Sequence, residues 1–431
     1  MRHVTDKLKL LVRDPQLKRK TYFTLFIFLV FRIFAFLPMP AIDFIRLKAL
    51  FSQNQFLSLL DIFSGGTLVN FSVMALGLNP YINASIIFQL LTVVVPRFEQ
   101  LAREGEYGRF KINQYTRALT VPLTIIQAVG IYFLLKNQKI ITTLNPVEFF
   151  SFIFTLVAGT FILVWFGELL TEYGLGNGIS LLIFAGIVGR APVFLGQFAS
   201  TLTSENVLNT IIFFGLGALV IMGVVFINEA VRKIPVYYAK RVKGNKMYQG
   251  ASNFLPLKLN QAGVIPIIFA VSFVLLPQLL GNFLGQVNNK AVASAALGLA
   301  RLFDPKGGLY NSVYFFLVVG FTYFYTLVVF NPQKIADEIQ KAGGFIPGIR
   351  PGSATSNYLS GVIYKITSVG ALFLGIIAVL PAILSAITGI TGLVIGGTGV
   401  LIVVSVILET FKAVEAQMVM KNYDRFQTRS M

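Results

Sequence analysis

Long apolar stretches separated by short polar segments dominate the chain. Windows of about 20 apolar residues, the length that crosses the hydrocarbon core of a bilayer, recur along it. We expect spans at 21–38, 79–95, 116–135, 149–167, 178–196, 207–228, 262–281, 312–331, 362–384 and 397–416. An even number of crossings places both ends of the chain on one side. The pattern therefore predicts an all-α polytopic membrane protein with ten transmembrane helices.

One apolar stretch, residues 61–96, is interrupted in its middle by residues that disfavour a helix. Its first half holds a glycine pair and two polar positions, each expected to weaken a helix in lipid. Its second half resumes as a helix, with Asn79 as the expected N-cap and Pro80 as the first helical residue. Irregular backbone at membrane depth survives only inside protein or beside a water-filled cavity. We therefore predict that this stretch lines a constricted pore, where Ile82 and Ile86 share one helix face.

The composition supports a membrane protein and restricts the chemistry. Of the 431 residues, 55% are apolar and 13% are charged, whereas about a quarter are charged in soluble domains. There is no cysteine and one histidine, so disulfides and His/Cys metal clusters are excluded. We expect no cofactor and no catalytic function. Because no Gly-x-x-x-x-Gly-Lys-Ser/Thr motif is present, energy should come from a partner or from the membrane potential.

The basic residues orient the spans. The chain has a net charge of +18 and 36 lysines and arginines, and most of them fall on the side of the N-terminus. Lysine and arginine accumulate in cytosolic loops, so both termini are predicted to be cytosolic. Arg32 lies inside the first expected span, where we expect it to snorkel or to face the protein interior, in a structural rather than a transport role.

The ten spans divide into two sets of five, 21–196 and 207–416, between a basic segment at 1–20 and a tail at 417–431. Because five is odd, equivalent halves would be inverted in the membrane. The second span of each half is disturbed, since residues 262–281 carry Pro266 and Pro277. The alternative is that glycine and proline are simply common in membrane helices.

Two cytosolic loops are long enough to fold. Within 229–260, strand-like residues surround a Gly-Asn turn, which predicts a hairpin with a basic tip. Within 332–361, a helix should begin after Asn331 and end at Gly343-Gly344. A stiff turn that presents Arg350 follows it. We interpret these protrusions as docking surfaces for an acidic macromolecule, although attraction to anionic lipid and the orientation rule are open alternatives.

Four motifs lie in order along the chain: ALGLNPYINASIIFQLL at 75–91, TEYGLGNGIS at 171–180, LPLKLNQAGVIP at 255–266 and IPGIRPG at 346–352. In this order they resemble the SecY family of bacterial protein-conducting channels, over essentially the whole chain. The resemblance implies an hourglass channel that passes unfolded secretory polypeptides across the membrane and releases signal and transmembrane segments sideways into lipid. It also implies partners: the SecE and SecG subunits, the SecA motor ATPase, the ribosome, signal peptides, translocating polypeptides and membrane lipids.

The resemblance also implies roles for individual residues. The plug, at about 62–75, would include Phe63, Ser64, Gly65, Gly66, Thr67, Leu68, Val69 and Asn70. The pore ring would be Ile82, Ile86, Ile183, Ile187, Ile268 and Ile402. The lateral gate would include Asn79, Pro80, Asn83, Gln89, Pro266 and Pro277, and partner docking would involve Lys240, Arg241, Lys243, Lys246 and Arg350.

An isoleucine ring suits sequence-blind transport, because branched apolar side chains exclude water and ions when the pore is empty. Any single isoleucine could instead pack against lipid or protein. A secondary transporter is the alternative function, since it shares inverted repeats and a broken midplane helix. It would place ionisable residues at the midplane, and here the candidates, Arg32 and Arg190, are few. An intramembrane protease is disfavoured because no paired aspartates lie within the spans.

Overall fold

The structure is a computed structural model, and it describes residues 14–39, 42–53, 61, 64–141, 144–201, 207–238, 241–243, 246–248, 252–285, 290–305, 307–388 and 396–429. The chain forms two compact units. The first comprises Met1–Thr210, Ser272–Tyr310 and Ile402–Met431, and the second comprises Ile211–Val271 and Asn311–Leu401.

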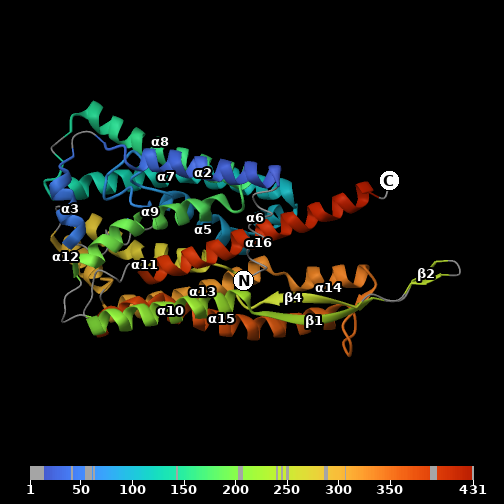
Figure 1. Cartoon of the computed structure of the whole chain (residues 1–431). Coiled ribbons are helices and arrows are strands. Elements are labelled where there is room, and N and C mark those ends of the chain that lie inside the picture. Colours follow the sequence, from blue (N-terminus) through green and yellow to red (C-terminus); the bar gives the residue numbers. More distant parts are fainter. Residues whose placement is uncertain are drawn as a thin grey trace. The chain divides into compact units, whose positions relative to one another are not determined.

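Helices make up most of the described chain (Figure 1). Those within the first unit are α2 (Pro15–Ala35), α3 (Phe44–Gln53), α5 (Asn79–Val94), α6 (Pro96–Arg103), α7 (Glu106–Asn137), α8 (Pro146–Tyr173), α9 (Gly178–Thr201) and α12 (Lys290–Leu302). The second unit holds α14 (Pro332–Lys341) and α15 (Ser353–Thr388). Four helices have residues in both units: α10 (Val207–Glu229), α11 (Ile265–Leu284), α13 (Gly308–Val329) and α16 (Gly396–Arg429).

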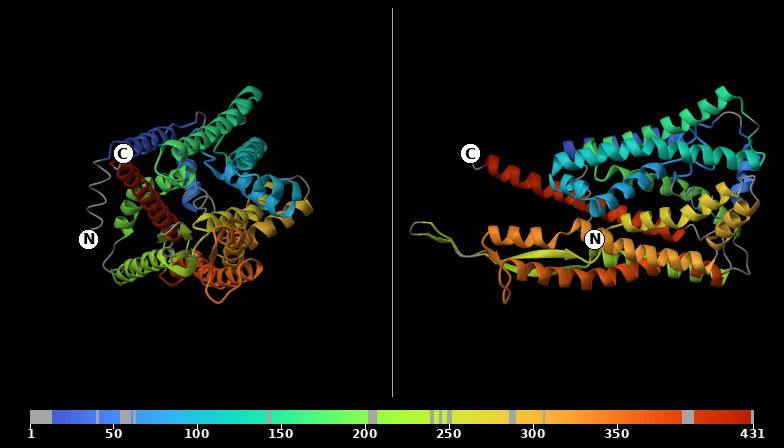
Figure 2. Two further views of the ribbon diagram at one scale, coloured as in Figure 1. Left: turned by 90° about the vertical axis from the view of Figure 1, so that its right-hand side faces the viewer. Right: turned by 180° about the vertical axis from the view of Figure 1, so that it is seen from behind.

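Helix α8 lies at the centre of the packing in the first unit. It contacts α2, α7 and α9, and α7 also contacts α5; Figure 2 shows α7 and α8 side by side. Leu156, Leu163 and Leu170 follow each other at intervals of seven along α8 and are almost fully buried, as expected for one helix face that packs against neighbours. By contrast, Phe154 and Trp165 of α8 are exposed.

A small antiparallel sheet forms part of the second unit. Its strand order is β4 (Ser252–Lys258), β1 (Val231–Tyr238) and β5 (Gly344–Phe345), with Val231 opposite Lys258 and Tyr237 opposite Phe345. Alternate residues of β1, Ile234 and Val236, are buried because successive side chains of a strand point to opposite faces. They join a core with residues of α14 and α15, including Ile339, Leu359 and Ile363.

Each of the ten predicted spans coincides with a helix. Among the described residues, four segments are long and apolar enough to cross a membrane: Glu106–Lys136, Pro146–Tyr173, Gly308–Lys341 and Ser353–Leu380. The number is five if α5 and α6, which meet at 99°, count as one broken span. Shorter apolar helices occupy Gly178–Val193, Phe214–Glu229 and Ile265–Gln278.

The helix boundaries agree with the sequence in one place and differ in another. Asn331 caps α14 as predicted, since its side chain accepts a hydrogen bond from the Lys334 N–H at 3.1 Å. The prediction that Asn79 is an N-cap is wrong: α5 begins at Asn79, and Leu78 is the cap. The reason is that the Leu78 carbonyl already accepts from the Ile82 N–H at 2.9 Å, while no side chain caps the helix.

The predicted basic hairpin is confirmed as β2 (Arg241–Lys243) paired with β3 (Lys246–Tyr248). The longer β1–β4 pair was not part of that prediction, which covered only the strand-like residues around the Gly-Asn turn, and each of its strands contains a proline, Pro235 in β1 and Pro256 in β4. Pro235 is tolerated because β5 pairs only with Tyr237 and Tyr238, so the β5-facing edge of β1 requires no N–H from position 235.

Candidate functional site

The irregular segment 64–78, between α3 and α5, is buried although it is not a regular helix. Thr67, Met74 and Ala75 have no exposed surface, and Phe71 is 1% exposed. The backbone passes through turns and has positive φ at Gly65 and Gly66, a conformation that costs glycine little. We refer to residues 64–78 as the buried segment.

Asp61 supplies hydrogen bonds that a regular helix would have supplied to the buried segment. Its carbonyl accepts from the Gly66 N–H at 2.9 Å and from the Ser64 hydroxyl at 3.0 Å. Its carboxylate Oδ1 accepts from the Val69 N–H at 2.8 Å. The Thr67 hydroxyl in turn donates to the Ser64 carbonyl at 2.9 Å. Because buried backbone groups need partners, this network lets the chain leave helical geometry inside the protein.

Two arginines from neighbouring helices reach the same place. Arg190 of α9 forms an ion pair with Asp61 Oδ2, and the Asp61 side chain is fully buried. Arg32 of α2 donates to the Gly65 carbonyl at 3.5 Å, and to the carbonyls of Ala185 and Gly186 at 3.2 and 3.3 Å. The expectation that Arg32 faces the protein interior is therefore confirmed. A charged group inside apolar surroundings is retained only with such partners.

The backbone of the buried segment packs directly against the backbone of α9. A Cβ atom on Gly65 would lie 2.8 Å from the Gly186 Cα, and one on Gly186 would lie 2.5 Å from the Gly65 Cα. Both distances are shorter than side-chain contacts allow. Glycine at both positions therefore permits the segment to sit directly on α9, beside the two arginines.

The structure buries most of the expected pore-ring residues. Ile82 and Ile86 lie four apart on α5, and Ile183 and Ile187 lie four apart on α9. All are buried except Ile187, which is half-buried. Ile402 of α16 is buried within the first unit, whereas Ile268 of α11 is buried within the second.

The expected gate residues lie on two helices. Asn79, Pro80, Asn83 and Gln89 are on α5, where Pro80 is buried and the other three are half-buried. Gln89 Nε2 donates to the Ser85 hydroxyl at 3.3 Å. On α11, Pro266 is buried in the second unit and Pro277 is half-buried in the first.

The expected plug residues form part of the buried segment. Ser64, Gly65, Gly66, Thr67 and Leu68 are buried, whereas Val69 and Asn70 are half-buried. Phe63 lies outside the described residues.

The expected docking residues belong to the second unit. Arg241, Lys243 and Lys246 lie on the β2–β3 hairpin, and Lys240 lies outside the described residues. Arg350 is exposed on the turn after β5, whose geometry is held by the Ile349 N–H donating to the Ile346 carbonyl at 3.1 Å. The turn is tied to α15 because the Thr355 hydroxyl donates to the Arg350 carbonyl at 2.9 Å.

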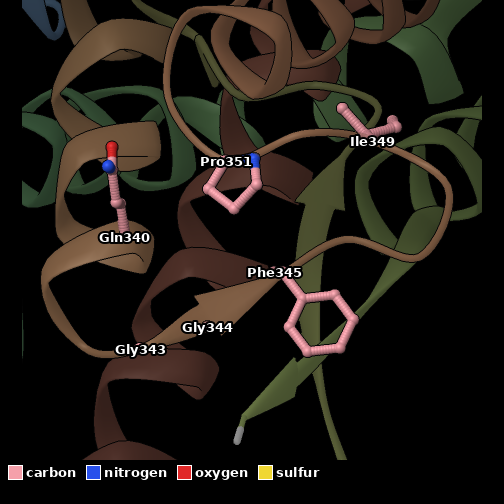
Figure 3. Close-up of a pocket in the computed structure, with 6 residues that line it drawn as sticks. All are labelled: Gln340, Gly343, Gly344, Phe345, Ile349 and Pro351. Carbon is pink, nitrogen blue, oxygen red and sulfur yellow. The ribbon is translucent and has the colours of Figure 1, made fainter.

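A pocket of about 360 Å³ lies beside Arg350. Figure 3 shows that α14, β5 and the turn each contribute to its wall. It is lined by Gln340, Gly343, Gly344, Phe345, Ile349 and Pro351. No group of His, Cys, Asp or Glu side chains that could hold a metal occurs in the part of the chain that the structure describes.

The chain is similar to known proteins over nearly its whole length. The SecY family profile matches residues 72–411. The chain belongs to the SecY family. A relative named protein translocase subunit SecY from Mycobacterium bovis is 43% identical, over 96% of this chain and 98% of its own. Another SecY relative, from Aquifex aeolicus, is 41% identical over 99% of this chain and all of its own.

Solved structures of low sequence identity share the fold. One, described as a protein conducting channel, has a TM-score of 0.61 at 20% identity and covers 93% of both chains. A second is a structure of a SecY protein whose plug domain is described as stabilising the closed state of the translocation channel. It has a TM-score of 0.62 at 21% identity, over 93% of this chain and 92% of that one. A third is the yeast Ssh1 complex bound to the ribosome, with a TM-score of 0.57 at 15% identity over 94% and 89%.

The two residues that sequence reasoning did not bring together are Asp61 and Arg190. Arg190 was noted only as an ionisable residue inside an apolar span, and Asp61 only as the start of the broken stretch. In the sequence, each is a charged residue in an apolar stretch, and a buried charge needs a partner of opposite charge. Only the fold shows that each is the partner of the other.

Proposed function

We propose that the chain is the channel subunit of a protein translocase, which passes unfolded secretory polypeptides across the cytoplasmic membrane. The observation that carries this proposal is the buried segment: a SecY-family chain holds an irregular stretch inside its first unit by an ion pair and hydrogen bonds rather than by a continuous helix. In this proposal residues 64–70, with Phe63, are the plug that closes the resting channel.

The ring of Ile82, Ile86, Ile183, Ile187, Ile268 and Ile402 is the constriction of the proposed pore. Its side chains offer no hydrogen-bonding groups, so they contact any passing chain without selecting its sequence. When the pore is empty, an apolar constriction excludes ions by dewetting. The burial of Ile82, Ile86, Ile183 and Ile402 supports a protein-facing rather than a lipid-facing position.

The proposed exit into lipid lies between α5 and α11, whose gate residues are Asn79, Pro80, Asn83, Gln89, Pro266 and Pro277. A signal peptide has a basic start and an apolar run, and lipid is the favourable environment for that run. Pro277 lies inside α11, where it removes a backbone hydrogen bond of the helix, which supports α11 as an element that can bend or move.

The proposed architecture has ten transmembrane helices in two inverted halves, 21–196 and 207–416, around an hourglass pore. The basic segment 1–20, the loops 229–260 and 332–361, and the tail 417–431 face the cytosol. The agreement of each predicted span with a helix supports this proposal, and so does the concentration of positive charge in these segments.

The proposed partners are SecE and SecG in the membrane, and SecA and the ribosome at the cytosolic loops. The exposed Arg350 and the basic β2–β3 hairpin are surfaces of the right charge for an acidic protein or RNA. The ribosome-bound Ssh1 complex, which shares the fold, supports the ribosome as a partner. Energy for transport comes from such a partner or from the membrane potential.

Transport by purified components tests the proposal. The chain, purified with its copurifying subunits and placed in proteoliposomes, should protect a signal-bearing precursor from added protease in the presence of SecA and ATP. A precursor without a signal peptide is the control and should remain accessible. Equal accessibility of both precursors, in vesicles that contain correctly inserted chain, would remove the proposed function.

A further inference from the structure

We infer that the Asp61–Arg190 ion pair is a latch: it holds the buried segment against α9 in the resting state and sets how readily the segment leaves. The inference rests on the proposed function and deepens it, because it names the residues that restrain the plug. It assigns Asp61 and Arg190 a positioning role, with Arg32 as a support.

One carboxylate joins the buried segment both to itself and to a helix. Asp61 Oδ1 accepts from the Val69 N–H at 2.8 Å, which closes the loop of the segment. Asp61 Oδ2 pairs with Arg190 of α9. One side chain therefore both closes the loop of the segment and ties it to α9, so a change at Arg190 reaches the segment through Asp61.

The two arginines differ in how many of their partners belong to the buried segment. Two of the three carbonyls that Arg32 contacts, Ala185 and Gly186, belong to α9, and only Gly65 belongs to the buried segment. If the segment leaves, Arg32 keeps its partners on α9. Arg190 instead loses the carboxylate of Asp61. The ion pair and the Arg32–Gly65 hydrogen bond are therefore the side-chain contacts with Arg190 and Arg32 that break when the segment leaves, and residues 71 and 73 are held in addition by backbone hydrogen bonds to Met39 and Leu37.

Gly66 leaves space for the Arg190 side chain beside the buried segment. A Cβ atom on Gly66 would lie 2.8 Å from Arg190 Cδ and 3.1 Å from Arg190 Cγ. The absence of a side chain at Gly66 thus lets the stem of Arg190 run against the segment on its way to Asp61. Separating a fully buried carboxylate from its ion-pair partner is costly, so the segment stays in place until another interaction replaces the pair.

A thiol placed in the buried segment measures how often the segment leaves. The chain has no native cysteine, and Thr67 is fully buried, so Thr67→Cys supplies one shielded reporter. The full chain with its copurifying subunits is reconstituted without precursor, and a membrane-impermeant maleimide is added on both sides. When opening is fast relative to labelling, the labelling rate follows the population of the open state.

Asp61→Asn, which keeps the shape and an acceptor for Val69, should raise the labelling rate about tenfold or more, because it leaves the Arg190 charge without its carboxylate. Arg190→Gln should raise it similarly, and the double variant should raise it no more than the larger single variant. Arg32→Gln should have a smaller effect. Arg117→Gln is the matched control: it breaks the Arg117–Glu168 ion pair between α7 and α8, which includes no residue of the segment, and should leave labelling unchanged.

Each result decides the inference. Wild-type labelling in Asp61→Asn or Arg190→Gln would overturn it, and so would independent effects that multiply in the double variant. A rise of similar size in Arg117→Gln would also overturn it, because the effect would then be general loosening. The proposed function is tested separately with the reporter alone, since an arrested signal-bearing precursor should raise labelling. If it does not while the latch variants do, the latch stands and the proposed function fails.

Discussion

Glycines at positive φ occur in both the buried segment 64–78 and the turn at 343–352, but they serve different purposes there. Both are short irregular stretches with glycines at positive φ beside an arginine. In the first, a Cβ on Gly65 would meet the Gly186 backbone at 2.8 Å; in the second, a Cβ on Gly348 would meet nothing within 4 Å. Glycine therefore permits close packing in one place and sharp presentation of a side chain in the other.

The charges differ in the same way. Arg190 and Arg32 are held by a buried carboxylate and by backbone carbonyls, so they stabilise one arrangement of the protein. Arg350 is exposed on a turn whose backbone is already fixed, so little conformational entropy remains to be lost on binding. Under the proposed function, the first region would control whether the channel is closed and the second would control what binds to it.

The largest expected contrast comes from adding one methyl group to each region. Gly65→Ala strains a positive φ and forces a contact with backbone, so we expect the closed state to lose about 3 kcal/mol or more. Resting ion leak through planar bilayers should rise. Gly348→Ala should cost only about 1 kcal/mol, from backbone strain alone, and leave leak unchanged. Equal effects of the two substitutions on leak would contradict the comparison.

The next largest effect tests the apolar constriction. Replacing Ile86, which is 1% exposed, by Asn places an amide among apolar neighbours at a cost of about 1–3 kcal/mol. We expect the resting conductance to rise, and to rise further when Ile187→Asn is added, because a wettable constriction no longer excludes ions. Ile126→Asn, at a position 65% exposed on α7, is the control. Unchanged conductance in the double variant would show that these residues do not form the constriction.

A charge reversal at Arg350 should act only on the exposed side. Arg350→Glu should abolish precursor-stimulated ATP hydrolysis by SecA and leave resting conductance at the wild-type value. Arg350→Lys keeps the charge but loses the forked donors, so we expect a loss of about 1.5–3 kcal/mol in coupling, or roughly tenfold to a hundredfold. Normal stimulation with the Glu variant would remove Arg350 from the proposed coupling.

The smallest effect concerns the helix that precedes the Arg350 turn. Asn331→Ala removes the cap of α14 and should cost about 1 kcal/mol locally, measured as faster hydrogen exchange of the first α14 amides. Asn331→Asp retains the acceptor and should preserve their protection. Faster exchange that extended to the amides of residues 64–78 would show that the two regions are not independent.

The sequence predicts this fold well wherever a pattern is local. Each predicted span is a helix, and the Asn331-Pro332 start and the Gly343-Gly344 end of α14 follow from capping preferences. The predicted Asn79 cap is wrong because the helix already begins at Asn79. Leu78 is the N-cap, although its side chain makes no capping hydrogen bond. The β1–β4 pair was missed because its second strand, Ser252–Lys258, lies beyond the residues around the Gly-Asn turn, and that turn carries no signal for the pairing of more distant residues.

The candidate site is predicted less completely, because its contacts join distant parts of the chain. The glycine pair and the polar residues marked segment 64–78 as irregular, and membrane physics required it to be enclosed. That Gly65 meets Gly186, and that Asp61 meets Arg190, depends on the approach of the segment to α9. No local pattern carries that information. The roles of the isoleucines came from the family motifs and stay predictions.

The central claim is that a translocating polypeptide passes between the α5 and α9 isoleucines, and a site-specific crosslink tests it most directly. Ile86→Cys, in a chain that has no other cysteine, is paired with a single cysteine in a precursor arrested by a folded C-terminal domain. The account predicts a signal-dependent disulfide at position 86 and none from Phe154→Cys on the exposed face of α8. A crosslink absent at position 86 while the arrested precursor remains protected from protease would contradict the claim.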